Sequence, residues 1–201
     1  MAHWAALLRG INVGGARRLA MADLRGLCAG LVWQRVESLG ASGNLIFSTD
    51  RDTGGDTGGD SGGDTGGDAR GDAAAAGALA AALAAVPAGR GGGIAVLVLP
   101  AAALRRALRD CPFATADPGR VHACFPFAEP VPDRALLEAL RAPDEALELG
   151  GWPPWLHAPA GIGRSRLAQR IEAVLGVPAT LRNLRSLARL AERLDARAGG
   201  C

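Results

Sequence analysis

The strongest constraint on the fold is an order of predicted strands and helices that occurs twice along the chain. Apolar runs and helical spacing predict strand, helix, strand, strand, helix, strand and a further helix in each half. In the first half these elements are expected at 3–9, 21–31, 36–41, 45–48, 73–86, 93–99 and 101–110. In the second half they are expected at 121–127, 133–142, 146–149, 155–157, 165–175, 179–182 and 184–196. The pattern predicts an α+β protein of two tandem ferredoxin-like subdomains (βαββαβ plus a helix), with antiparallel sheets that carry helices on one face.

The predicted boundary between the two subdomains divides the chain into 1–110 and 111–201. Within the first, residues 49–72 are rich in Asp and Gly, and four tandem copies of Thr/Ser-Gly-Gly-Asp run from Thr53 to Asp68. This segment has no apolar residue that could anchor it to a core, so we expect a disordered insertion. Weak cation binding is the alternative, although the period of the known calcium-binding repeats differs.

Composition narrows the class of protein. The formal net charge is +2, and all 22 basic residues are Arg, so charge alone indicates no nucleic-acid partner. Neither an apolar run of membrane-spanning length nor a signal peptide is visible. The four cysteines form no Cys-x-x-Cys pair, and His122 and Cys124 are expected to share one face of a strand. We therefore expect a cytoplasmic protein with reduced thiols and without a metal site, cofactor or membrane contact.

The candidate functional residues lie in loops that the predicted topology brings together at sheet edges. The first group joins the loop after the first strand to a hairpin and comprises Arg9, Gly10, Asn12, Gly14, Gly15, Ser42, Gly43 and Asn44. The second joins a loop before a helix to the end of the last strand and comprises Gly163, Arg164, Ser165, Arg182 and Asn183. Backbone N–H groups of Gly-rich loops and arginine side chains bind anions. The pattern favours a small anionic ligand, nucleotide or phosphate-like; tight turns and a helix capped by Ser165 are the structural alternative.

Two other classes of function stay open. The last predicted helix carries Arg185, Arg189, Arg193 and Arg197 at steps of four, which indicates either a solvated face or contacts to a nucleic-acid backbone. RNA binding on a sheet would need exposed aromatic rings, and the candidates are Trp4, Phe47, Phe125, Phe127 and Trp155. However, the run at 94–99 is apolar on both faces, which predicts that both faces of its sheet are covered. The third class is a non-catalytic protein-interaction module. No catalytic motif appears, and enzymatic activity is left open.

Several short segments resemble one bacterial family. They are LLRGINVGG at 7–15, MADLR at 21–25, SGN at 42–44, CPF at 111–113, GIGRSRL at 161–167 and PATLRN at 178–183. Together they are similar to DUF1697, a domain of unknown function. The resemblance implies two ferredoxin-like α+β subdomains and no established activity. This chain has Ala41, Arg166 and Leu184 where the family usually has Gln, Lys and Trp.

Overall fold

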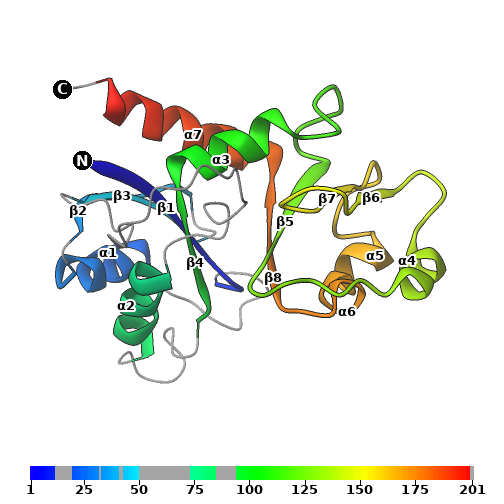
Figure 1. The fold of residues 1–201 in the computed structure, drawn as a ribbon, viewed down its shortest axis with the longest axis horizontal. Coiled ribbons are helices and arrows are strands. Elements are labelled where there is room, and N and C mark those ends of the chain that lie inside the picture. Colours follow the sequence, from blue (N-terminus) through cyan, green and yellow to red (C-terminus); the bar gives the residue numbers. More distant parts are fainter. Residues whose placement is uncertain (12–19, 32, 41–42, 50–72, 85–93, 200–201) are drawn as a thin grey trace, which may run out of the picture. The chain divides into compact units, whose positions relative to one another are not determined.

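The computed structural model describes residues 1–11, 20–31, 33–40, 43–49, 73–84 and 94–199 (Figure 1). It is a mixed α+β protein whose described residues form two four-stranded antiparallel sheets and seven α-helices. The chain divides into two compact units, one made of Met1–Leu104 and Leu190–Cys201 and the other of Arg105–Arg189. Of the predicted insertion at 49–72, Thr49 ends a strand, and the rest lies outside the described residues.

The first unit holds the first sheet, and its elements fall close to the predicted ones. They are β1 (Ala2–Leu8), α1 (Met21–Ala29), β2 (Gln34–Ser38), β3 (Asn44–Thr49), α2 (Ala73–Ala84) and β4 (Val96–Pro100). The strand order is β2-β3-β1-β4, and every neighbouring pair is antiparallel. Figure 1 shows α1 and α2 on the same face of this sheet.

Side chains along β1 alternate between two buried faces. Trp4, Ala6 and Leu8 pack in a core to which α1 contributes Leu24 and α2 contributes Leu79. The intervening residues of β1 point to the opposite face and are fully buried as well. Both faces of the first sheet are therefore covered, as the apolar run at 94–99 predicted.

A β-bulge interrupts β2 near its start. Gln34 lies opposite Ser48, but Glu37 lies opposite Ile46, so the register shifts by one residue between these two pairs. Within the bulge, Arg35 has a left-handed backbone with φ +53°. Because side chains alternate along a strand, this extra residue decides which face Glu37 occupies.

The second unit repeats the order of strands. Its elements are β5 (Val121–Pro126), α4 (Arg134–Leu140), β6 (Ala146–Glu148), β7 (Trp155–His157), α5 (Arg166–Gln169), α6 (Ile171–Leu175) and β8 (Ala179–Asn183). The strand order is β6-β7-β5-β8, again with antiparallel neighbours. The helices pack on one face around a core that includes Cys124, Leu156, Leu167 and Val174.

The predicted helix at 165–175 is a pair of short helices, which corrects the prediction of a single one. The backbone leaves the helical region at Arg170, with φ −116° and ψ 17°, so α5 ends there and α6 begins. No Gly or Pro marks this break in the sequence. The C-terminus of α6 does carry a recognisable signal, because Gly176 adopts the left-handed conformation that commonly ends helices.

Two further helices each contain residues of both units, because the unit boundaries in the sequence fall within them. These are α3 (Ala101–Arg109) and α7 (Leu184–Ala198). On α7, Leu187, Leu190 and Leu194 are fully buried, as their spacing predicted. In the described part of the chain, no helix has the length and apolar character needed to span a membrane.

Candidate functional site

The structure brings together the described parts of the first predicted group. The N–H of Leu8 donates a 2.8 Å hydrogen bond to the carbonyl oxygen of Gly43. Gly43 has φ +73°, and a Cβ atom on it would lie 2.7–2.8 Å from side-chain carbons of Ile11 and Leu8. Only glycine fits this contact without displacement, so the end of β1 and the hairpin before β3 are locked against each other. Asn12, Gly14, Gly15 and Ser42 lie outside the described residues.

Other members of this group have defined backbone roles. The N–H of Arg9 donates to the carbonyl oxygen of Ala95 at 2.9 Å, and Arg9 is half-buried. Gly10 turns the chain with φ +66°. Asn44 is buried and closes the hairpin, because its Nδ2 donates to the carbonyl oxygen of Leu39 at 3.4 Å and its own carbonyl accepts from the Leu39 N–H.

The second predicted group comprises residues of the loop before α5 and of the end of β8. Leu181 packs against the core beneath α5 and α6, so alternation along β8 turns Arg182 to the opposite face of the sheet. There the Nη1 of Arg182 donates to the Thr180 Oγ1 at 2.7 Å and to the Leu181 carbonyl at 2.8 Å. Burial lowers the pKa of Arg182 to about 10, so it is still charged at neutral pH. Gly163 and Arg164 are exposed in the loop before α5.

Two polar side chains of this group cap helices. The Oγ of Ser165 accepts from the N–H of Ala168 at 2.9 Å and caps α5, as predicted for the structural alternative. The Oδ1 of Asn183 accepts from the N–H of Ser186 at 2.8 Å at the start of α7. These bonds satisfy helix N–H groups, so Ser165 and Asn183 act in structure at these positions.

The residues that do meet at this edge of the second sheet were missed in the sequence. Asp117 accepts from the Gly119 N–H at 2.8 Å and lies 3.5 Å from the Nη2 of Arg185. The guanidinium of Arg120 lies across Gly161, where a Cβ atom would collide with it. The Asp-Pro-Gly sequence at 117–119 is a turn signal that could have located this contact.

His122 is a buried polar residue on β5, opposite Asn183. The residue is 5% exposed, and its Nδ1 has no hydrogen-bond partner among the described residues. Burial lowers the pKa of His122, and the positive charge of Arg120 lowers it further. A hydrogen bond to the backbone of Arg120 raises the pKa but does not cancel the decrease. Cys124 shares its face, and burial raises the pKa of that thiol to about 12. Within the described ranges, no group of three His, Cys, Asp or Glu could hold a metal ion.

The four arginines of α7 do not form one free stripe, which corrects that expectation. Arg185 pairs with Asp117, whereas Arg193 and Arg197 both pair with Glu37 of β2. Arg197 is buried on the same side of the helix as Leu190 and Leu194. Burial raises the pKa of the Glu37 carboxyl, but hydrogen bonds from Arg193 and Arg197 outweigh this and lower it.

The aromatic residues considered for RNA binding are largely inside the structure. Trp4, Phe47, Phe125 and Trp155 are buried, and Phe127 is half-buried. Trp33 stacks on Phe47 with ring centroids 3.7 Å apart. These rings therefore serve packing and do not form an exposed stacking surface.

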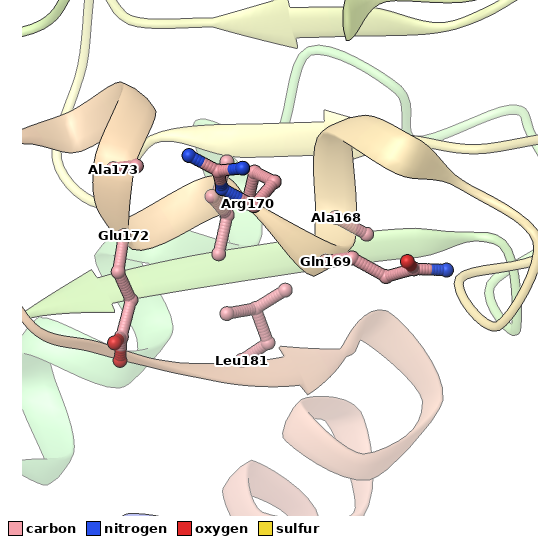
Figure 2. Close-up of a pocket in the computed structure, with 7 residues that line it drawn as sticks. Ala168, Gln169, Arg170, Glu172, Ala173 and Leu181 are labelled. Atoms are coloured by element: carbon pink, nitrogen blue, oxygen red, sulfur yellow. The ribbon is translucent and has the colours of Figure 1, made fainter.

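A pocket of about 440 Å³ lies at the break between α5 and α6 (Figure 2). Its lining combines the polar Gln169, Arg170 and Glu172 with the apolar Ala168 and Leu181, and it also includes Ile171 and Ala173. The Oε1 of Glu172 accepts from the Ala179 N–H at 3.0 Å. The pocket contains none of the predicted site residues.

Comparisons with known proteins agree with the resemblance read from the sequence. A family model described as "Protein of unknown function (DUF1697)" matches residues 1–57, the part that holds the first predicted group. No curated protein matches the chain. The solved structure of the conserved bacterial protein SP0830 from Streptococcus pneumoniae is similar over 97% of this chain and 99% of that chain. Its TM-score is 0.63 at 22% identity, so the likeness shows a shared fold.

Replacing Gly43 with Ala should lower the free energy of unfolding by about 2–4 kcal/mol, through left-handed strain and the clash with Ile11 and Leu8. Gly10→Ala and Gly40→Ala are matched controls, because both positions have positive φ and open space around a Cβ atom. Each control should lose only about 1–2 kcal/mol. Chemical denaturation measures all three, and equal losses would contradict the proposed lock.

Acid should destabilise the fold through His122. Its folded-state pKa lies below that of the unfolded chain, so the unfolded chain binds a proton first as the pH falls. The free energy of unfolding should therefore decrease below about pH 6.5. Denaturation curves from pH 8 to pH 5 should show this slope in the wild type. The slope should weaken in His122→Gln, and an unchanged slope there would refute the assignment.

Proposed function

We propose that the protein binds a small anionic ligand, nucleotide or phosphate-like, at the end of the first sheet. The site consists of Arg9, Gly10 and Ile11 together with Gly43 and Asn44. The observation that carries the proposal is the close contact of Gly43 with Leu8 and Ile11. This contact holds the start of the Gly-rich loop beside the hairpin before β3, and Arg9 lies where the two meet. Arginine side chains and the N–H groups of loops are both groups that favour anion binding.

Two observations favour this edge over its counterpart in the second unit. There, Ser165 and Asn183 are used as helix caps and Arg182 faces the other side of its sheet. In addition, the family match covers residues 1–57 and thus the first group alone. Ligand binding by the second group would have to displace existing helix caps.

We also infer that each unit is a ferredoxin-like subdomain of a cytoplasmic protein. Support comes from the strand orders β2-β3-β1-β4 and β6-β7-β5-β8, each produced by a strand-helix-strand-strand-helix-strand sequence. Cys28, Cys111 and Cys124 are free and buried, which fits a reducing compartment.

A thermal-shift screen at low salt tests the binding site directly. The wild type is tested with nucleotides, sugar phosphates, inorganic phosphate, carboxylates and single-stranded oligonucleotides. A ligand at 100 times its Kd adds about 2.7 kcal/mol of stability, which the screen detects. Arg9→Ala should weaken binding of the active anion roughly 10- to 100-fold, since it removes a charge-assisted hydrogen bond.

Arg25→Ala is the control, because it removes an exposed arginine of the same unit outside the proposed site. A shift that is kept in Arg9→Ala but lost in Arg164→Ala would move the site to the second unit. A shift from oligonucleotides alone would favour the nucleic-acid alternative. If no compound shifts the transition, the anion proposal fails and the protein-interaction module is favoured.

A further inference from the structure

A cluster of hydrogen bonds on one carboxylate, that of Glu37, links the end of α7 to the first sheet. The Oε1 of Glu37 accepts from Arg193 at 2.6 Å (Nη2) and 3.1 Å (Nε). Its Oε2 accepts from the Nη2 of Arg197 at 3.1 Å. One acidic residue of β2 therefore binds two arginines that are one turn apart on the helix, all within the first unit.

The β-bulge at Arg35 is what turns Glu37 toward the helix. If the register of the Gln34–Ser48 pair continued, Glu37 would lie opposite Leu45, whose side chain belongs to the core with α1 and α2. The extra residue places Glu37 opposite Ile46, on the other face. Arg35 adopts an unfavourable left-handed backbone for this purpose, so a local conformational cost accompanies the contact.

The three side chains of this contact between β2 and α7 differ strongly in their exposure to solvent. The Arg197 side chain is 9% exposed, whereas that of Arg193 is 55% exposed and that of Glu37 is 35% exposed. In the described part of the chain, the Nη1 of Arg197 has no hydrogen-bond partner. Arg197 is thus a buried charge that depends on Glu37, and loss of this partner leaves an uncompensated charge inside the protein.

We propose that residues 190–198 of α7 act as a strap, fastened by Glu37, that opens as a local unit while the first sheet stays folded. The buried side of the strap carries Leu190, Ala191 and Leu194, so opening exposes an apolar stripe. Because Arg197 is buried and charged, the closed state is stable only while the Glu37 carboxylate is present. The buried leucines by themselves would hold the helix closed whether or not this carboxylate is present.

Native-state hydrogen exchange with peptide resolution tests the strap on the full chain. In Glu37→Gln, amides of 190–198 should exchange about ten-fold faster or more, while amides of β1 and β3 keep their wild-type rates. Glu138→Gln is the matched control, because it breaks an exposed 2.8 Å pair with Arg141 in the second unit. It should leave the exchange of 190–198 unchanged.

Arg197→Met provides the decisive second variant. It removes the buried charge and keeps an apolar side chain of similar length, so the strap should stay closed. In the double variant Glu37→Gln with Arg197→Met, exchange of 190–198 should return close to the wild-type rate, because no charge is left to compensate.

Three results would overturn the proposal. The first is unchanged exchange of 190–198 in Glu37→Gln. The second is an equal increase in β1, β3 and the strap, which would mean global rather than local opening. The third is a double variant that exchanges as fast as Glu37→Gln, which would show that the charge of Arg197 is not what the carboxylate compensates.

Discussion

β1 lies between β3 and β4 at the centre of the first sheet, and it presents buried side chains on both faces. A strand of this kind needs a covering layer on each side, because a fully buried Leu contributes about 1.5–3 kcal/mol. α1 and α2 provide the layer on one face. The compact unit around this sheet also includes Leu190–Cys201, from the far end of the chain. The first unit is therefore built from both ends of the chain.

The sequence predicted the strands and most helices well, because their hydrophobic periods are clear. The exceptions depend on features that carry no local signal. Nothing in the residues around Arg170 indicates that one helix becomes two, and nothing around Arg35 indicates a bulge. Both are departures of the backbone at a single residue. The bulge matters more, because one residue of offset moves Glu37 from one face of the sheet to the other.

The arginines of α7 show why equal spacing is a poor guide to a shared face. A step of four residues turns about 40° more than a full helical turn, so three steps turn about 120°. Arg197 therefore lies in line with Leu190 and Leu194, although Arg185 sits on the solvent side. The buried Arg197 pairs with a carboxylate, which Glu37 of β2 supplies. The apparent basic stripe is in fact made of residues with separate tasks.

The residue types that bind anions are also those that close turns and cap helices. Asn44, Ser165 and Asn183 belong to the predicted ligand-binding groups, and each also makes a hydrogen bond that closes a turn or caps a helix. Their identity alone could not separate the two roles, because both need a small polar side chain near backbone N–H groups.

The first predicted site lies at one end of the first sheet, and a similar junction of two loops occurs in the second unit. The two junctions differ in the groups that make the closest contact. Each has a glycine with positive φ at the point where two loops meet, Gly43 in the first unit and Gly161 in the second. At Gly161 the neighbour is the guanidinium of Arg120, so a cation occupies the space that a Cβ atom would need. At Gly43 the neighbours are aliphatic carbons of Ile11 and Leu8. The contact between the first pair of loops is thus apolar, whereas the contact between the second pair involves a cation.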